Sequence, residues 1–176
     1  MSISLSKEKL IEVLKGASLA GSTPEKISFA GVEYDSREIK GGELFIALKG
    51  GANHGHQFVK QAFERGASIC LVEDSQAAKN SEFPERCVVV EDTLKAFWEL
   101  ASYWRNELAI PVLAVTGSVG KTTIKEMTAS LLLRREQGVY SLKSHNNQTG
   151  VPYTICRAAR HHRWAVLEMG MNHAGE

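Results

Sequence analysis

Hydrophobic and polar positions in the N-terminal half of the chain follow the periods of short helices and strands. After Ser6, apolar residues recur three or four positions apart, which predicts a capped first helix that Gly16 closes. Residues 27–50 contain short β-type runs broken by turn residues, and residues 56–65 return to a helical period. We therefore expect this half to mix short strands with short helices.

The middle of the chain carries the clearest helical pattern. Two β-type runs at residues 68–73 and 87–91, separated by a polar loop, come before it. An apolar stripe then extends from Asp92 until Pro111 stops the helical period. Its members are Leu94, Phe97, Trp98, Ala101, Trp104 and Leu108. We expect the aromatic members to pack in a core or between domains, because they share one helical face.

The C-terminal part alternates strands with helices. A continuous apolar run at residues 110–117 predicts a central parallel strand that is buried on both faces. A helix is expected over residues 124–136, beginning near the lysine of the loop before it, and a second helix near residues 152–159. Short strands are expected at residues 139–142 and 164–169.

This alternation indicates an α/β fold with two domains. We place a small α/β domain at residues 1–90 and the start of a Rossmann-like, parallel-sheet domain at residues 91–176, with the long helix as a bridge. The net charge of +1 implies no broad basic surface for nucleic acid. No apolar run reaches the length of a membrane span, and the three cysteines are scattered, so we expect a cytoplasmic protein without membrane insertion.

The segment T-G-S-V-G-K-T-T is a variant of the phosphate-binding P-loop. Ala114 stands where the strict pattern has its first glycine. A buried strand before the segment and a helix after it favour a phosphate site over an ordinary strand-to-helix turn. We therefore expect this loop to bind the phosphates of ATP with Mg²⁺. The expected phosphate-binding residues are Thr116, Gly117, Ser118, Val119, Gly120, Lys121, Thr122 and Thr123.

Three side chains have expected roles in this site. Lys121 can reach the β- and γ-phosphates, and Thr122 can place its hydroxyl on magnesium. Glu168 ends an apolar strand run, where a carboxylate can point into the cleft at the carboxyl end of the sheet. We therefore expect Lys121 and Glu168 to be catalytic, and Thr122 and Glu168 to hold the metal. The alternative for Glu168 is a solvated carboxylate at the end of a strand.

Several segments together resemble the Mur ligases, which build the peptide stem of bacterial peptidoglycan. The P-loop is similar to the ATP loop of that family, and the segment that begins YDSREIKGGELF is similar to the UDP-sugar-binding domain of its two late-acting members. The stretches HNNQTGVP and LEMGMNHAGE point to the last-acting member. The resemblance covers about residues 28–176, and four motifs in the family's order are more specific than any one of them.

The resemblance implies an ATP- and Mg²⁺-dependent peptide ligase that proceeds through an acyl phosphate. Its partners would be UDP-MurNAc-tripeptide and D-Ala-D-Ala, and we expect a monomer. The residues that the resemblance places at the muramoyl-peptide substrate are Asp35, Ser36, Arg37, Asn146 and Asn147. The first three would lie near the uridine diphosphate end, in the UDP-sugar-binding domain at residues 1–90. Asn172 would lie near the ATP end of the cleft.

Simpler interpretations stay open for several of these residues. Residues 35–37 could form only a turn with an Asx hydrogen bond, and residues 146–147 could form a plain turn. His54 and His56 suggest a metal site only weakly, because two imidazoles without a third ligand in the sequence do not make one.

Family enzymes continue well beyond residue 176, through the adenine pocket and the D-Ala-D-Ala site. The resemblance therefore implies an N-terminal piece of a ligase, and we expect no turnover from the chain alone. Two alternatives stay open: the preceding Mur ligase, which adds the third stem residue, and a piece that only binds a nucleotide sugar. The motif at residues 145–152 favours the last ligation step.

Overall fold

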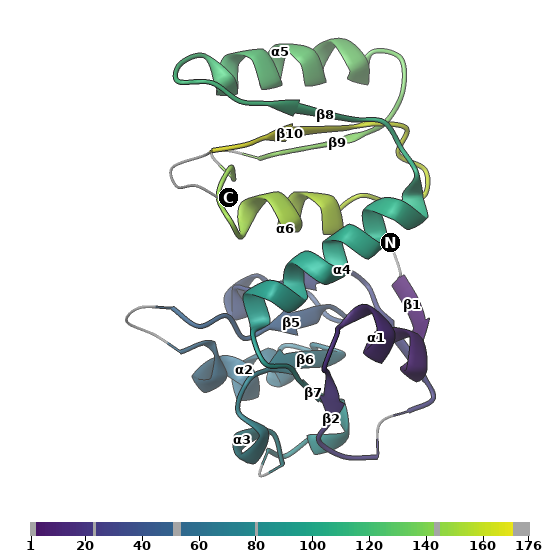
Figure 1. Cartoon of the computed structure of the whole chain (residues 1–176), viewed down its shortest axis with the longest axis vertical. Helices are drawn as coiled ribbons and strands as arrows, with labels where there is room; N and C mark the ends of the chain where they lie inside the picture. Colours follow the sequence, from purple (N-terminus) through teal and green to yellow (C-terminus); the bar gives the residue numbers. More distant parts are fainter. Residues whose placement is uncertain (1–2, 23, 51–53, 80, 143–144, 171–176) are drawn as a thin grey trace. The chain divides into compact units, whose positions relative to one another are not determined.

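The computed structural model describes residues 3–22, 24–50, 54–79, 81–142 and 145–170. These residues form two compact units, Met1–Leu100 and Ala101–Glu176, which are described separately (Figure 1). The division falls inside the long helix α4 (Thr93–Leu108), a little beyond the boundary expected at residues 90–91. In the described part of the chain, no helix combines the length and the apolar character that crossing a bilayer requires.

A five-stranded sheet forms the centre of the first unit, with the order β2-β7-β6-β5-β4. Its strands are β2 (Ser18–Leu19), β4 (Val32–Glu33), β5 (Leu44–Ile46), β6 (Ile69–Val72) and β7 (Cys87–Val89). Strands β4 to β7 are parallel, and β2 pairs antiparallel with β7. A separate antiparallel ribbon joins β1 (Ile3–Ser6) to β3 (Lys26–Phe29). The sequence pattern did not predict β1, because four residues are too few to show a period.

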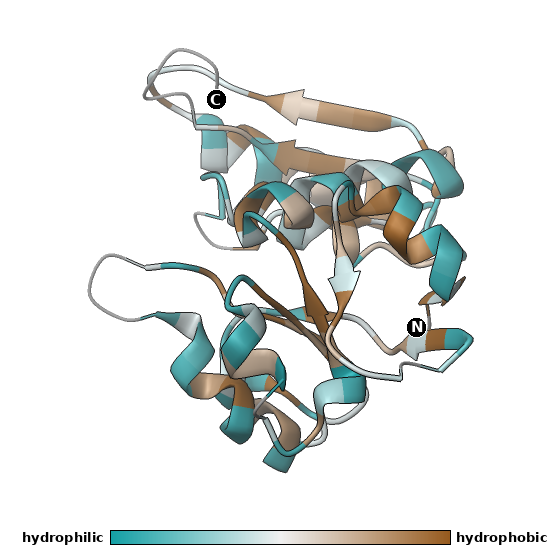
Figure 2. Cartoon of the chain, turned by 60° about the horizontal axis from the view of Figure 1, so that its bottom comes forward, coloured by the Kyte–Doolittle hydropathy of each residue, from teal (hydrophilic) through white to brown (hydrophobic). Residues whose placement is uncertain are grey.

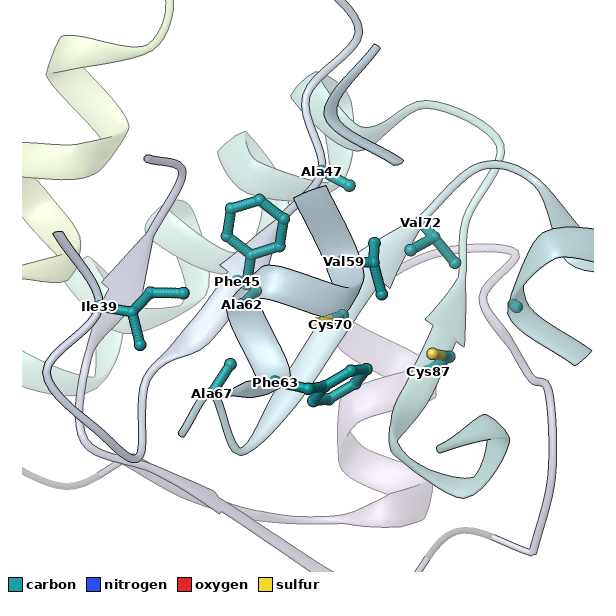
Figure 3. Packing of buried hydrophobic residues seen from close by; sticks show 11 residues of the cluster. Ile39, Phe45, Ala47, Val59, Ala62, Phe63, Ala67, Cys70, Val72 and Cys87 are labelled. Atoms are coloured by element: carbon teal, nitrogen blue, oxygen red, sulfur yellow. The ribbon is translucent and has the colours of Figure 1, made fainter. Parts of the chain in front are cut away.

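Short helices cover the sheet of the first unit. They are α1 (Lys7–Val13), α2 (Val59–Glu64) and α3 (Ser75–Lys79), with the 3-10 turns η1 (Ser36–Glu38), η2 (Gly55–Phe58) and η3 (Pro84–Arg86). The expected cap of α1 is present, because the Ser6 hydroxyl accepts the Lys9 N–H at 3.2 Å. Apolar residues of α2, β5 and β6 pack into one cluster that includes Phe45, Ala62 and Cys70 (Figure 3).

The second unit is a three-layer arrangement around a parallel sheet with the order β8-β10-β9. The strands are β8 (Val112–Val115), β9 (Val139–Tyr140) and β10 (Ala165–Glu168). Helix α5 (Lys121–Leu133) lies on one face of this sheet and α6 (Gly150–Cys156) on the other (Figure 1). The parallel α/β architecture expected from the sequence is confirmed in this unit.

The expectation that β8 is a central, fully buried strand was wrong. Strand β8 was expected to be central, but among the described residues it lies at the edge of its sheet, and Leu113 is 49% exposed. The central strand is β10, whose four residues are all buried. Trp98 is 37% exposed although Phe97 and Trp104 of the same helix are buried. Hydropathy colouring shows apolar residues concentrated in the strands (Figure 2), but apolar character does not decide a strand's position in its sheet.

Candidate phosphate and magnesium site

The P-loop follows β8 and ends at the first residue of α5. Gly117 and Gly120 have φ angles of 142° and 81°, which only glycine adopts without strain. Gly120 is the N-cap residue of α5 and offers no side chain to the first N–H groups of the helix. Those N–H groups therefore remain available to an anion at the positive end of the helix dipole. The glycine positions expected from the motif thus have the backbone geometry that a phosphate loop needs.

Lys121 closes the loop from the helix side. Its Nζ donates a hydrogen bond to the carbonyl oxygen of Gly117 at 2.6 Å, so the side chain folds back over the loop. Thr122 and Thr123, in the first turn of the helix, are exposed, as are residues 116–120. An ammonium group held above exposed backbone is suited to contact the outer phosphates of a nucleotide.

Glu168 is buried at the carboxyl end of β10, with 1% of its surface exposed. The side-chain amide of Asn146 donates to Glu168 Oε1 at 2.9 Å, and the Glu168 N–H donates to the Ser141 hydroxyl at 3.0 Å. Glu168 Oε2 is buried without a hydrogen-bond partner among the described residues. The interpretation of Glu168 as a solvated carboxylate is therefore wrong.

The sheet brings this carboxylate to the edge from which the P-loop leaves. Glu168 pairs in register with Val115, the residue immediately before the loop. The carboxyl ends of parallel strands share one edge of a sheet, which is the usual place for ligands in open α/β folds. A hard carboxylate oxygen with no hydrogen-bond partner is suited to Mg²⁺, so the residues present fit this cation.

Lys125 belongs to the same cluster, and the sequence pattern did not identify it. Its side chain is completely buried, and its Nζ lies 3.7 Å from Glu168 Oε2 and 2.9 Å from Glu126 Oε1. One signal was available, because Lys125 shares a helical face with Ala129, which is also buried. Ser141 was also missed, since a single serine near the end of a short strand carries no distinguishing pattern.

The two asparagines of the 145–152 motif have different environments. Asn146 contacts Glu168, as described above. The Asn147 side-chain oxygen accepts the N–H groups of Thr149 at 3.3 Å and Gly150 at 2.9 Å, which forms an Asx turn just before α6. The plain-turn interpretation therefore accounts for Asn147, whereas Asn146 reaches the candidate metal carboxylate. Asn172 lies outside the described residues.

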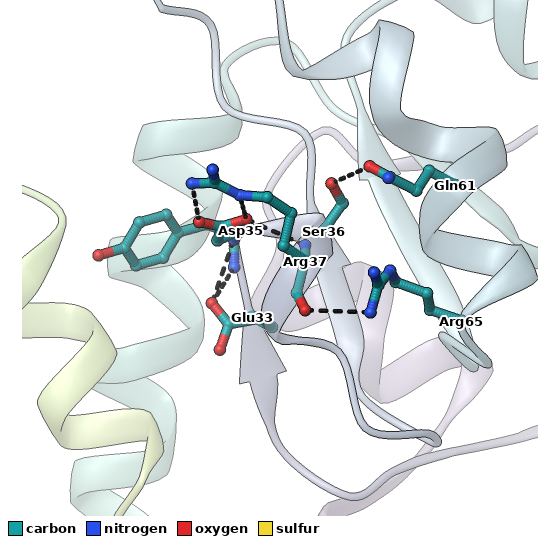
Figure 4. A network of polar contacts seen from close by, with 7 residues as sticks. Glu33, Asp35, Ser36, Arg37, Gln61 and Arg65 are labelled. Atoms are coloured by element: carbon teal, nitrogen blue, oxygen red, sulfur yellow. Dashed lines mark hydrogen bonds and ion pairs between the residues drawn. The ribbon is translucent and has the colours of Figure 1, made fainter.

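Residues 35–37 form a polar network in the first unit (Figure 4). The Asp35 carboxylate accepts the Arg37 N–H at 3.0 Å and pairs with the Arg37 guanidinium at 2.9 and 2.7 Å. This guanidinium lowers the pKa of Asp35 below its usual value. The buried Ser36 donates its hydroxyl proton to Gln61 Oε1 at 2.6 Å. The Asx turn is present, and the exposed Arg37 head group adds a positive charge beside it.

The His56 side chain forms hydrogen bonds with the backbone after β6. Its Nε2 accepts the N–H groups of Glu73 at 2.7 Å and Asp74 at 3.1 Å. A ring nitrogen that accepts two backbone N–H groups has no lone pair to offer a metal.

Two parts of the chain match descriptions of one protein family. Residues 28–105 match the Mur ligase family, catalytic domain, and residues 115–176 match the Mur ligase middle domain. The chain belongs to the Mur ligase family. The P-loop and Glu168 thus lie in the part that matches the Mur ligase middle domain, and residues 35–37 lie in the other part.

Several sequence relatives are ligases of the same name. The chain is 38% identical over 174 residues to the UDP-N-acetylmuramoyl-tripeptide–D-alanyl-D-alanine ligase of Escherichia coli, and 37% identical over 169 residues to that of Bacillus subtilis. These alignments cover 99% and 96% of this chain but 36% of each relative. The chain therefore spans little more than a third of the length of these Mur ligases.

Solved structures of proteins with the name MurF are similar to this chain in fold. A crystal structure of MurF from Acinetobacter baumannii superposes with a TM-score of 0.83 at 32% identity, over 99% of this chain and 37% of that one. MurF ligase from Thermotoga maritima in complex with ADP has a TM-score of 0.70 at 30% identity, over 82% of this chain and 33% of that one. The expected mixed α/β fold of a Mur ligase is confirmed.

Proposed function

We propose that this chain is part of an ATP-dependent peptide ligase that joins D-Ala-D-Ala to UDP-MurNAc-tripeptide. The observation that carries the proposal is the P-loop, with left-handed Gly117 and Gly120 and a folded-back Lys121, in a chain 38% identical to ligases of that name over nearly its whole length. Residues 1–90 would bind the UDP-sugar, and residues 91–176 would begin the ATP-binding domain. ATP and Mg²⁺ would be required, in a monomeric cytoplasmic enzyme.

The chain's residues would act mainly through position and charge. The N–H groups of the loop and of the α5 N-terminus would hold the nucleotide phosphates, with Lys121 against the outer ones. Thr122 and Glu168 would hold Mg²⁺, which would neutralise charge on the phosphates during transfer. In the complete enzyme, the tripeptide carboxylate would take the γ-phosphoryl group and ADP would leave. The amine of D-Ala-D-Ala would then attack the acyl carbon, and phosphate would leave.

The substrate contacts are proposed from position and charge. Arg37 presents its exposed guanidinium next to the Asx turn of Asp35, which is suited to a diphosphate. Asn146 would support Glu168 and lie near the transferred phosphate, with Asn147 beside it. The catalytic residues would be Lys121 and Glu168. The chain spans little more than a third of its relatives, so we expect it to bind its ligands without ligating them.

Separate titrations of the chain with Mg-ATP and with UDP-MurNAc-tripeptide test this proposal. Both should bind. Lys121→Met should weaken Mg-ATP binding at least about tenfold, since a hydrogen bond to a charged group is worth about 1.5–3 kcal/mol. Arg135→Gln removes one exposed positive charge just after α5 and serves as the control, with unchanged affinity expected. Full Mg-ATP affinity in Lys121→Met would contradict the phosphate site.

Two alternatives predict different results. Binding of the UDP-sugar peptide without any binding of Mg-ATP would support a piece that binds only a nucleotide sugar. In the complete enzyme, phosphate release should require both the tripeptide substrate and D-Ala-D-Ala. Release that requires diaminopimelate or lysine with the dipeptide precursor would move the assignment to the preceding Mur ligase.

A further inference from the structure

A buried lysine faces the carboxylate that is proposed to hold magnesium. Lys125 lies one turn after Lys121 on α5, and its side chain is 0% exposed. Burying an ammonium group is costly unless nearby negative charges compensate it. Among the described residues, Lys125 forms ion pairs with Glu168, whose side chain is 2% exposed, and with Glu126, whose side chain is 49% exposed.

The two neighbours differ in how closely they approach. The distance from Lys125 Nζ to Glu126 Oε1 is 2.9 Å, which allows a direct hydrogen bond, whereas the distance to Glu168 Oε2 is 3.7 Å. Lys125 therefore balances the charge of Glu168 without occupying the lone pairs of Oε2. Asn146 holds the other oxygen of Glu168 at 2.9 Å, so the carboxylate has a fixed orientation, and its buried Oε2 has no hydrogen-bond partner among the described residues.

We propose that Lys125 is a positioning residue that serves as the internal counter-cation of Glu168 and competes with the divalent ion for it. This inference rests on the proposed function. A divalent ion that reaches Glu168 meets the positive charge of Lys125 at short range, where the dielectric is low. The phosphates of a bound nucleotide supply the negative charge that outweighs this repulsion. Metal alone therefore binds weakly, and metal with nucleotide binds firmly.

Binding of Mn²⁺ to the 176-residue chain tests this proposal without any need for ligation. Free Mn²⁺ is measured by electron paramagnetic resonance, with and without ADP. In the unsubstituted chain, ADP should tighten Mn²⁺ binding. Lys125→Met removes the competing charge and should tighten binding of Mn²⁺ alone about tenfold, whereas Lys125→Arg retains the charge and should bind Mn²⁺ as the unsubstituted chain does.

For a second variant we expect the opposite change in affinity for Mn²⁺ alone. This test does not depend on whether Lys125→Met folds. Glu126→Gln removes the carboxylate that lies 2.9 Å from Lys125 Nζ, so less of the lysine's charge is compensated beside Glu168 and Mn²⁺ alone should bind about threefold more weakly. Glu126 is half exposed, so this variant should fold. Glu136→Gln removes an exposed carboxylate just after α5 and is the matched control, with unchanged Mn²⁺ binding expected.

The outcomes separate this inference from the proposed function. Tighter Mn²⁺ binding in Lys125→Met or weaker binding in Glu126→Gln, with the control unchanged, supports the counter-cation. If the unsubstituted chain binds Mn²⁺ with ADP but neither variant changes the affinity for Mn²⁺ alone, the counter-cation is refuted and the ligase proposal stands. If Mn²⁺ does not bind even with ADP, or if it binds and Glu168→Gln leaves its affinity unchanged, the proposed metal site fails. The counter-cation then fails with it.

Discussion

Replacement of Asn146 by alanine tests how strongly the Glu168 carboxylate depends on the hydrogen bond that the Asn146 side chain donates to it. The Asn146 amide donates to Glu168 Oε1 at 2.9 Å, and the other oxygen, Oε2, has no hydrogen-bond partner among the described residues. Among the described residues, Asn146→Ala would thus leave the buried carboxylate without a side-chain hydrogen bond, with Lys125 Nζ at 3.7 Å. A hydrogen bond to a charged group contributes about 1.5–3 kcal/mol, so we expect the free energy of unfolding of the second unit to fall by about 2 kcal/mol.

Urea denaturation followed by tryptophan fluorescence can measure this loss in the right unit. Trp104 and Trp164 both belong to the second unit and are nearly buried, whereas Trp98 belongs to the first. If every variant also carries Trp98→Phe, the tryptophan fluorescence therefore reports unfolding of the second unit alone. Separate transitions for the two units are expected, because a two-state treatment holds for single domains.

Asn147→Ala provides a matched control from the adjacent residue. Asn147 accepts the Gly150 N–H through its side-chain oxygen in the turn before α6, and a hydrogen bond between neutral groups is worth about 1 kcal/mol. The Asn146 variant should therefore lose more stability than the Asn147 variant. If Asn146→Ala loses no more than Asn147→Ala, the hydrogen bond to Glu168 does not carry the energy assigned to it, and the account of a fixed carboxylate is wrong.

Three further predictions concern other parts of the chain. Burial raises the pKa of all three cysteine thiols, so Ellman's reagent at pH 8 should react slowly with the native chain and rapidly in urea. Arg37→Gln should raise the pKa of Asp35 toward its usual value in an NMR titration. Because Arg37 lowers the folded pKa of Asp35, any stability that this pair contributes should be present above about pH 4 and be lost as the pH falls through the lowered pKa. Met127 and Leu131 are 62% and 63% exposed on α5, so the chain should associate in a concentration series by light scattering, and Met127→Glu with Leu131→Glu should reduce that association.

Features set by local chemistry were predictable from the sequence. Gly117 and Gly120 adopt the positive φ angles that their motif requires, and Ser6 caps its helix through its own hydroxyl. The helices and strands of the second unit also lie close to their expected ranges. A cap, a left-handed turn and an amphipathic period depend on a few neighbouring residues, so the order of residues specifies them directly.

Strand position and side-chain environment were decided by tertiary structure. The apolar run of β8 looked central, but within the described residues its pairing places it at the edge of the sheet, and β10 is central. Residues 35–37 and 146–147 were ambiguous between turn and site, and only the contact of Asn146 with Glu168 separated it from Asn147, whose side chain forms a turn.

The sequence by itself determined the α/β class, and it predicted a phosphate loop with Lys121 and proposed Glu168 as a candidate metal carboxylate. Only the tertiary structure showed that Glu168 is buried and that Lys125, from a different element, faces it at 3.7 Å. The physical reason is that a loop's backbone geometry depends on adjacent residues. The charge balance of a buried carboxylate depends instead on residues far apart in the chain, which only the packing of α5 against β10 brings together.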